Sequence, residues 1–316
     1  MASISIQVDK KQFNRIERFY KNYQIKPVQY SVFRSKVGST TITGYTSGKI
    51  LFQGTDAEAE AQQWQSSAQP QTSKNNKNSS VNNNNHSTLP ANFDQWTIIG
   101  SDEVGNGSYF GALTVCSVYL SKEQFDLVKL YGVKDSKLLS DVEIIKIAED
   151  LKQTVKYHLT VCNPQKYNQA INSGYNAVSI KVSLHNHTIG RLLSSLSEEE
   201  VNQLQAILID QFTPPTSYMK YLKKEKYPVD NNLYFVKQAE GKHLAVACAS
   251  IIARAAFLES LKTLGQEYHT QLPSGAGRNV DIFASKLINK YGVQALNNTA
   301  KLHFKNTDKA KALSKK

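Results

Sequence analysis

Hydrophobic and polar positions in the first 66 residues predict six short elements in the order β-α-β-β-β-α. Alternating positions predict strands, and apolar residues at helical spacing predict helices. The strands cover 4–8, 28–36, 39–47 and 49–54, and the helices cover 10–23 and 56–66. Because neighbouring strand residues point to opposite faces, the sheet has one face for the helices and one lined by Tyr, Thr, Arg and Lys.

The regular pattern of hydrophobic and polar positions is absent between residues 69 and 92. This stretch, QPQTSKNNKNSSVNNNNHSTLPAN, is poor in apolar residues and rich in Asn and Ser. Such a composition cannot bury enough apolar surface to fold, so we expect a flexible linker. The chain is therefore predicted to contain a small α+β domain over 1–68, a linker over 69–92 and a second domain over 93–316.

The second domain has the pattern of an α/β fold. Short apolar runs predict strands at 96–103, 111–120, 156–162 and 205–212, and a further run extends over 234–240. Helices are predicted near 122–130, at 141–155, at 176–196 and after residue 242. Small residues early in the last of these helices would let it lie close against the sheet.

Charge points to a polyanionic partner. The chain has 316 residues, 40% of them hydrophobic, and a formal net charge of +12. Nine basic residues and one acid, Glu17, lie between Lys10 and Lys49. A compact domain with this balance attracts polyanions, which makes nucleic acid the first candidate, although solubility alone could explain a weaker bias. The open sheet face is a reasonable platform for it, with Arg34, Lys36, Tyr45 and Lys49 among its side chains.

No run of residues approaches the roughly 18 apolar positions of a membrane span, and the N-terminus lacks the apolar core of a signal peptide. We therefore expect a soluble cytoplasmic protein that does not bind membranes. No oligomerisation pattern is evident, so a monomer without an obligate protein partner is the default. Cys116, Cys162 and Cys248 lie far apart in apolar segments, which favours buried reduced thiols over zinc ligands or disulfides.

The segment from Ile98 to Gly111, IIGSDEVGNGSYFG, carries the most informative chemistry. An apolar strand leads to adjacent acids, Asp102 and Glu103, and a glycine-rich turn follows. Adjacent strand residues point to opposite faces, so the two acids can share a site only if the strand ends or the backbone turns there. Carboxylate oxygens in such a pair suit Mg²⁺ or Mn²⁺. The alternative is a solvated strand end followed by a plain turn.

Two further acids lie at the edges of predicted apolar elements, Asp210 near the end of 205–212 and Glu240 just before the long helix. Four converging carboxylates could bind two metal ions that clamp a phosphate, activate water and stabilise the leaving 3′-oxygen. The sequence offers no Ser/His/Asp or Cys/His arrangement that would supply a protein nucleophile. The competing interpretation is a non-catalytic nucleic-acid-binding protein in which the acids are structural.

Several motifs together resemble those of bacterial ribonuclease HIII, a type 2 ribonuclease H family. They are GSDEVGNGSYFGALTV, VKDSKLLS, ILIDQF and QAEGKHLAVACASIIAR, in this order. The segment YTSGKILFQG in the first domain resembles the repeats of TATA-box-binding protein, so that domain looks TBP-like. The resemblance implies an RNase H-like fold with a mixed central sheet flanked by helices. It also implies cleavage of the RNA strand of RNA/DNA hybrids with Mg²⁺ or Mn²⁺, leaving 5′-phosphate and 3′-hydroxyl ends.

The resemblance also implies roles for individual residues. The family's metal-binding and catalytic acids fall on Asp102, Glu103, Asp210 and Glu240. The loop that contacts the RNA backbone and its 2′-hydroxyls falls on Gly105, Asn106 and Gly107, and a second substrate loop falls on Lys134, Ser136 and Lys137. Asn106 departs from the family pattern, which leaves the reading of 2′-hydroxyls open. A different RNase H-fold nuclease, such as a junction resolvase, is the enzymatic rival.

Other polar residues have simpler interpretations. His185 and His187 are two apart on a predicted helix, which is the wrong spacing for ligands that share one face. His243 is expected to cap the turn before the long helix or to neutralise phosphate. The stretch PSGAGR, residues 273–278, is expected to be a glycine-rich loop before a helix, and the basic C-terminal tail a solvated helix end.

Overall fold

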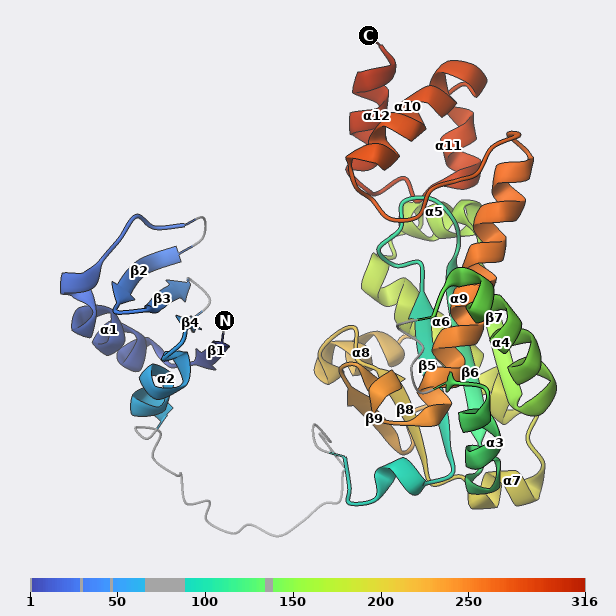
Figure 1. The fold of residues 1–316 in the computed structure, drawn as a ribbon, viewed down its shortest axis with the longest axis horizontal. Helices are drawn as coiled ribbons and strands as arrows, with labels where there is room; N and C mark the ends of the chain where they lie inside the picture. Colours follow the sequence, from blue (N-terminus) through green and yellow to red (C-terminus); the bar gives the residue numbers. More distant parts are fainter. Residues whose placement is uncertain (1, 29–30, 46–47, 66–88, 134–138, 316) are drawn as a thin grey trace. The chain divides into compact units, whose positions relative to one another are not determined.

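The computed structural model describes residues 2–28, 31–45, 48–65, 89–133 and 139–315. The chain separates into two compact units, Met1–Val81 and Asn82–Lys316. The point of separation falls within the predicted linker, most of which lies outside the described residues. Each unit is described by itself below, and the helices and strands are labelled as in Figure 1.

The N-terminal unit is the expected small α+β domain. Its elements are β1 (Ala2–Gln7), α1 (Lys10–Phe19), η1 (Lys21–Tyr23), β2 (Ser31–Val37), β3 (Thr40–Tyr45), β4 (Lys49–Gly54) and α2 (Ala57–Gln65). The four strands form an antiparallel sheet in the order β1-β4-β3-β2. Asp9 starts α1 by accepting a hydrogen bond from the backbone N–H of Gln12. The order β-α-β-β-β-α predicted from the pattern is confirmed.

The pairing register of the strands shows which residues lie on each face of this sheet. Ile42 pairs with Ser35 and with Phe52, and these positions point toward the two helices and their buried aromatic residues. The intervening positions point the other way: Arg34 is paired with Thr43, and Lys36 with Thr41. The open face predicted from alternation is therefore present.

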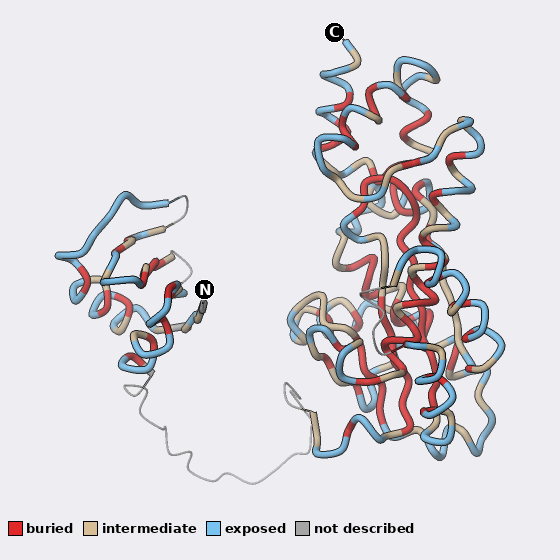
Figure 2. The backbone as a smooth tube through the Cα atoms, viewed as in Figure 1, coloured by how far each residue is buried: buried red, intermediate tan, exposed pale blue. Residues whose placement is uncertain are grey.

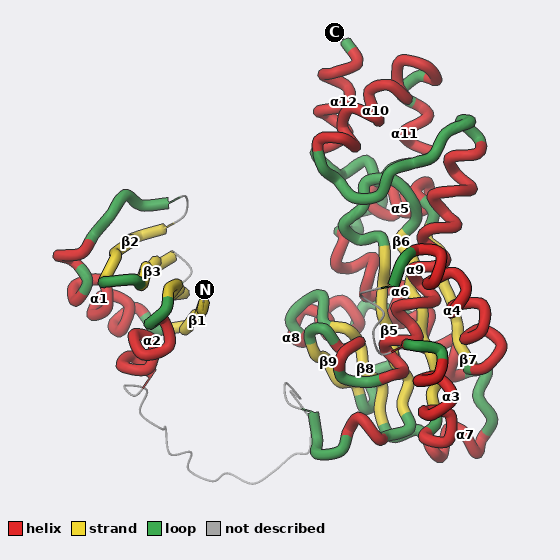
Figure 3. Tube along the Cα trace, viewed as in Figure 1, coloured by secondary structure: helices red, strands yellow, loops and turns green. Residues whose placement is uncertain are grey.

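The C-terminal unit is built on a five-stranded mixed sheet in the order β7-β6-β5-β8-β9. The strands are β5 (Ile98–Val104), β6 (Leu113–Leu120), β7 (Lys156–Cys162), β8 (Ala206–Asp210) and β9 (Leu233–Val236). The first three strands pair antiparallel, and β8 and β9 run parallel to β5. This is the expected RNase H-like sheet, and Figure 3 shows its strands lying among helices.

Helices cover both faces of this sheet. They are η2 (Phe93–Gln95), η3 (Lys122–Gln124), α3 (Phe125–Leu130), α4 (Asp141–Thr154), α5 (Pro164–Asn172), α6 (Ala177–Leu193), α7 (Glu198–Gln203), α8 (Pro215–Leu222), η5 (Ala239–Gly241), α9 (Leu244–Gln266), α10 (Arg278–Tyr291), α11 (Gln294–Thr299) and α12 (Asn306–Ser314). One core joins α3, α4 and α9 to one face, and a second core joins α6 and α8 to the other. The most buried backbone follows the central strands and α9 (Figure 2).

Gly100 sets the distance between β5 and α9. A Cβ atom at this position would lie 2.4 Å from the carbonyl carbon of Ala245 and from the backbone nitrogen of Val246. The first turn of α9 therefore crosses directly over β5, as the small residues of α9 suggested. Gly100 and Asp102 are two residues apart on β5 and point to the same face. The start of α9, which contacts Gly100, therefore also lies near Asp102.

Sequence patterns missed part of this unit. Helices α5, α7, α8 and α11 were not predicted, since each is at most nine residues long and covers too few turns to be detected by its period. The C-terminal tail is not a solvated helix end: Asn306, Thr307 and Ala310 of α12 are buried against α10. Apolar and hydrogen-bonding contacts thus extend to the end of the described chain.

Helix α9 is the one helix of the described residues with the length and hydropathy of a membrane span, and most of its apolar stretch is buried inside the unit. It is therefore a core helix by its contacts. The three cysteines are buried, as predicted, and none of them forms a disulfide bond among the described residues.

Candidate active site

The side chains of Asp102 and Glu103 point to opposite faces of β5. We expected the strand to end or the backbone to turn at this pair, but β5 continues to Val104, and Gly105 with its positive φ follows it. The two side chains therefore point to opposite faces, and their charges interact across the end of the strand. Asp102 points toward α9, on the side of Gly100, and is 6% exposed. Glu103 points toward α6. The two residues remain coupled, because the Glu103 backbone N–H donates a 2.7 Å hydrogen bond to Oδ1 of Asp102.

Two basic residues of α6 hold Glu103. Lys181 Nζ donates to Glu103 Oε1 at 3.1 Å, and His185 Nε2 lies 3.1 Å from Glu103 Oε2. Asn176 fixes the start of α6 by accepting hydrogen bonds from the backbone N–H groups of Val178 and Ser179. Sequence analysis did not predict this contact of His185 with Glu103. The signal was the i, i+4 spacing of Lys181 and His185, which places both on one helix face.

Asp210 lies at the C-terminal end of β8 and Glu240 lies in η5, and both are near the C-terminal end of β5. Strand β8 runs parallel to β5 with Ile209 opposite Ser101, so the next residues along, Asp210 and Asp102, lie beside each other. The backbone N–H of Ala239 donates to Oδ1 of Asp210 at 2.7 Å. Ser250 of α9 donates to Oε2 of Glu240 at 3.4 Å and also lowers the pKa of Asp102 by hydrogen bonding.

The four acids interact electrostatically. Burial, followed by the charges of Glu103 and Asp210, raises the pKa of Asp102 well above its ordinary value. Burial also raises the pKa of Asp210; the Ala239 N–H opposes this shift, and the charges of Glu103 and Glu240 add to it. Burial alone would raise the pKa of Glu103 too, but His185 and Lys181 outweigh it and the pKa is lowered.

This donor set fits a hard divalent cation. All four acids carry carboxylate oxygens, and burial together with neighbouring negative charge raises the pKa of Asp102 and Asp210, an unfavourable effect that a bound cation would offset. Within the described ranges, no three His, Cys, Asp or Glu side chains are already arranged as a metal cage. Glu103 in particular has both oxygens engaged by α6, so its side-chain contacts must change or be shared when a metal binds.

The glycine-rich loop lies at the end of β5. Gly105 has a φ of +95°, and a Cβ there would lie 2.2 Å from the carbonyl oxygen of Ala112, so both its backbone conformation and its space require glycine. Asn106 and Gly107 are exposed, and a Cβ on Gly107 would meet nothing within 4 Å. The backbone of this part of the loop is therefore open to a ligand.

The loop continues into a segment held by the C-terminal helices. Tyr109 N–H donates to the carbonyl of Gly275 at 2.8 Å, and Gly275 N–H donates to Oγ of Ser108 at 3.1 Å. The stretch 273–278 is thus a support for the glycine-rich loop as well as a connection to α10. Lys301, 1% exposed, donates from Nζ to the carbonyl of Gly111 at 2.7 Å. Sequence analysis did not single out Lys301.

The remaining predicted residues divide into three groups. Arg34, Lys36, Tyr45 and Lys49 belong to the N-terminal unit, where all four are at least partly exposed. Lys134, Ser136 and Lys137 lie outside the described residues. His243 is the N-cap of α9: its Nδ1 accepts from Ala245 N–H at 3.0 Å and its Nε2 lies 3.0 Å from the Trp96 carbonyl. Because His243 is 3% exposed, it caps the helix and does not reach phosphate.

Residues 99–307 match the family model described as Ribonuclease HII, and residues 3–77 match a domain of unknown function (DUF3378). The chain is 45% identical to the ribonuclease HIII of Enterococcus faecalis over 98% of both chains, and 43% identical to that of Bacillus cereus over 99% of both. The chain belongs to the ribonuclease HIII family. It is therefore a ribonuclease H enzyme.

Solved structures agree with this family. The crystal structure of Bst-RNase HIII in complex with Mn²⁺ has a TM-score of 0.68 and 34% identity over 99% of both chains. The crystal structure of a mutant of the same protein has a TM-score of 0.69 and 34% identity over the full length of both chains. The resemblance found in the sequence motifs is confirmed, as is the RNase H-like fold.

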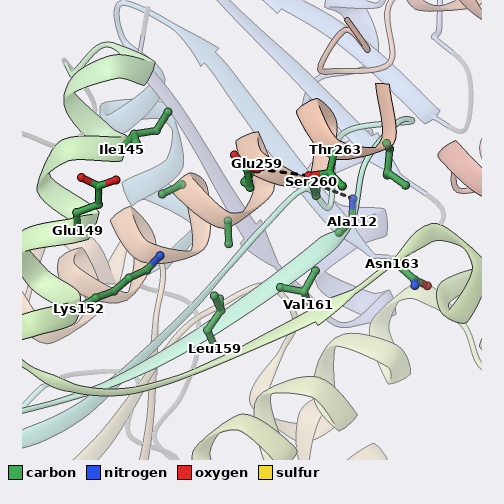
Figure 4. Close-up of a pocket in the computed structure, with 13 residues that line it drawn as sticks. Ala112, Ile145, Glu149, Lys152, Leu159, Val161, Asn163, Glu259, Ser260 and Thr263 are labelled. Atoms are coloured by element: carbon green, nitrogen blue, oxygen red, sulfur yellow. Dashed lines mark hydrogen bonds between the residues drawn. The ribbon is translucent and has the colours of Figure 1, made fainter. Parts of the chain in front are cut away.

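A separate cavity of about 610 Å³ lies between α4, β7 and α9 (Figure 4). Its lining is mostly apolar, with Leu159 and Val161 of β7 on one side, and Ser260 accepts a 3.1 Å hydrogen bond from the backbone N–H of Ala112 at its wall. None of the four acids lines this cavity. It is therefore distinct from the carboxylate cluster of this ribonuclease HIII family member.

Lys301 gives a prediction for the pH dependence of stability. Burial lowers its pKa from 10.5 to about 7, whereas the unfolded chain keeps the ordinary value. Between these values the unfolded state binds more protons, so the contribution of Lys301 to the free energy of unfolding rises with pH, by roughly 2 kcal/mol from pH 7 to pH 9. We expect the difference in urea-unfolding free energy between the wild type and Lys301→Met to change by about this amount.

Taking the difference between the two proteins removes the contribution of groups that do not interact with Lys301. Burial raises the pKa of Cys116 and of Cys248, which lowers stability at alkaline pH in both proteins equally. A wild-type minus mutant difference that stays constant from pH 7 to pH 9 would show that Lys301 keeps its ordinary pKa in the fold.

Proposed function

We propose that this enzyme is an endonuclease that hydrolyses the RNA strand of RNA/DNA hybrids with bound Mg²⁺ or Mn²⁺. The observation that carries the proposal is the electrostatic interaction of Asp102, Glu103, Asp210 and Glu240 near the C-terminal ends of β5 and β8, where burial and then the charges of neighbouring acids raise the pKa of Asp102 and Asp210. The Mn²⁺ complex of Bst-RNase HIII supports a divalent metal. The family supports a ribonuclease H reaction.

We assign the four acids as the residues that hold the metal. When bound, two such ions would supply activation of a water molecule and stabilisation of the leaving 3′-oxygen, giving 5′-phosphate and 3′-hydroxyl ends. The protein residues provide the negative charge and the orientation. Asp102 and Asp210 lie on neighbouring parallel strands, Glu240 is held by Ser250, and Glu103 is held by α6.

Discrimination between RNA and DNA would follow from backbone contacts beside this cluster. Gly105, Asn106 and Gly107 follow β5 directly, and the open backbone at Gly107 would let a ribose approach closely. Lys134, Ser136 and Lys137 would contact phosphate oxygens. A cut strand with 2′-hydroxyls beside a deoxyribose strand suits such a site, so duplex RNA and duplex DNA are expected to be poor substrates.

The N-terminal unit, assigned to residues 1–68, would add affinity through its open sheet face. Arg34, Lys36 and Lys49 provide positive charge there, and Tyr45 provides an aromatic ring. The segment 69–92 would tether this unit to the catalytic domain, 93–316. We further propose that the enzyme acts as a cytoplasmic monomer, without a membrane or an obligate protein partner.

Cleavage of an end-labelled RNA/DNA hybrid tests this function. We expect nicking of the RNA strand alone with Mg²⁺ or Mn²⁺, no nicking with EDTA, and little cleavage of matched RNA or DNA duplexes. Mapping the product ends checks the expected 5′-phosphate. Cleavage of duplex DNA would favour a different RNase H-fold nuclease, and hybrid binding without cleavage under every metal would mean that the acids are not a working site.

A further inference from the structure

The contact between α6 and Glu103 is more elaborate than an ordinary buried ion pair. Lys181 is 4% exposed and His185 is fully buried, and each engages a different oxygen of the same carboxylate. The aromatic ring of Phe212 lies against both basic residues: its centroid is 4.1 Å from Lys181 Nζ, and the ring stacks on His185 with centroids 5.2 Å apart. Phe212 therefore offers the Lys181 ammonium a second contact that does not require Glu103.

His185 is fixed from behind by a chain of hydroxyl groups. Its Nδ1 lies 2.8 Å from Ser101 Oγ, and Ser117 Oγ donates to Ser101 Oγ at 2.9 Å. An ionised carboxylate only accepts hydrogen bonds, so Nε2 of His185 donates to Glu103. On its other side, Nδ1 is held by Ser101, whose hydroxyl also donates to the Cys116 carbonyl at 3.3 Å. The orientation of His185 is thus determined within the protein and does not depend on Lys181.

We propose that Lys181 is a built-in counter-cation for Glu103 that neutralises this carboxylate while no metal is bound and moves off it when a divalent ion binds. His185 remains in contact and keeps Glu103 oriented. The inference rests on the proposed metal site. Its physical basis is that an ammonium and a divalent cation on one buried carboxylate repel each other, and that the Phe212 ring can retain the displaced ammonium.

Calorimetric titration of Mn²⁺ into metal-free protein tests the proposal, with Lys181→Gln as the informative variant. Glutamine can still donate to Glu103 but carries no charge, so the metal no longer competes with an ammonium. We expect Mn²⁺ to bind Lys181→Gln about tenfold more tightly than the wild type, because a unit charge beside a divalent ion outweighs one hydrogen bond. Lys181→Arg, which keeps the charge, should bind within about threefold of the wild type.

The control is Lys156→Gln. Lys156 forms a 2.6 Å ion pair with Glu200 near the start of β7, and neither residue belongs to the acid cluster. The same substitution there should leave Mn²⁺ affinity unchanged. Without metal, Lys181→Gln should melt several degrees below the wild type, and saturating Mn²⁺ should reduce this gap, because tighter binding stabilises the folded state more.

The results distinguish the counter-cation role of Lys181 from the proposed metal site. Equal or weaker Mn²⁺ binding by folded Lys181→Gln would overturn the counter-cation role and leave Lys181 as a residue that stays on Glu103. Absence of Mn²⁺ binding by the wild type would overturn the metal site itself. If both Lys181 variants fail to fold, nitrogen-15 NMR of the wild-type lysine ammonium groups decides: the Lys181 signal should shift on saturation with Mg²⁺, and an unchanged signal would refute its displacement.

Discussion

Asp102→Asn is expected to abolish cleavage of an RNA/DNA hybrid without weakening hybrid binding. Asparagine has the same size and can still accept the 2.7 Å hydrogen bond from the Glu103 N–H, but it removes one charged metal ligand. Loss of metal-dependent stabilisation worth several kcal/mol corresponds to a fall of roughly 10³-fold or more in the single-turnover rate. Rapid-quench kinetics measures this rate, and fluorescence anisotropy in EDTA measures binding.

The same substitution should not destabilise the metal-free protein. The folded-state pKa of Asp102 is raised by burial and by Glu103 and Asp210, so the stability associated with its protonated form is lost as pH rises through that value. Ionisation of Asp102 in the fold therefore opposes folding, whereas Asn resembles the uncharged, protonated form. Thermal unfolding in EDTA at pH 7 should give a midpoint for Asp102→Asn equal to or above that of the wild type.

Asp126→Asn is the matched control. The Asp126 side chain is almost completely exposed on α3, and its ion pair with Lys129 is a surface contact of little energetic weight. Its substitution removes the same charge from the same domain and should leave the cleavage rate unchanged. Retention of more than a tenth of the wild-type rate by Asp102→Asn would argue that Asp102 is not a metal ligand in the reaction.

The sequence determined much of the fold because local pattern and long-range packing agree. Alternation identified every strand of the N-terminal sheet, and small residues at Ala245 and Ala249 correctly indicated that α9 lies close to β5. The helices α8 and α11 were missed for a physical reason: each has only six to eight residues, which is too short for a periodic pattern to be distinguished from a loop, and helices of this length depend on tertiary contacts.

The candidate site could be predicted only in part. Asp102, Glu103, Asp210 and Glu240 were recognised by motif, and the register of β5 against β8 explains why two of them are neighbours. The orientation of Glu103 could not be read from the motif, because it depends on whether β5 ends or continues. Lys181 and His185 were missed because His185 was considered only together with His187, and the i, i+2 spacing places those two residues on different helix faces.

Lys301 was missed for a different reason. Its partner is a backbone carbonyl 190 positions away in sequence, and a lone lysine in KLHF carries no pattern that indicates burial. Contacts of this kind follow from the packing of the C-terminal helices against the loop after β5, and packing at that sequence separation has no local signature.

Removal of residues 1–68 is expected to weaken hybrid binding far more than it slows the chemical step. The four acids and their described partners all lie in the C-terminal unit, so the cleavage rate of bound substrate should change little. A tethered second binding site raises the local concentration of substrate without altering the chemistry, so its loss should raise KM by on the order of 10- to 100-fold. Steady-state and single-turnover cleavage by the truncated and full-length enzymes separate the two effects.

Point variants in the full-length chain locate this effect on one face of the N-terminal unit. Replacing Arg34, Lys36 and Lys49 with alanine removes three positive charges from the sheet side, whereas replacing Lys10, Lys11 and Arg18 removes the same residue types from α1. If the sheet face binds the hybrid, the first triple variant should reproduce most of the KM increase and reduce the salt dependence of binding by roughly one unit of slope per lost phosphate contact. The α1 variant should have a smaller effect on both.

Equal KM values for the truncated and full-length enzymes would refute a substrate-binding role for the whole N-terminal unit. Equal effects of the two triple variants would mean that the net charge of this unit, and not its sheet face, provides the affinity.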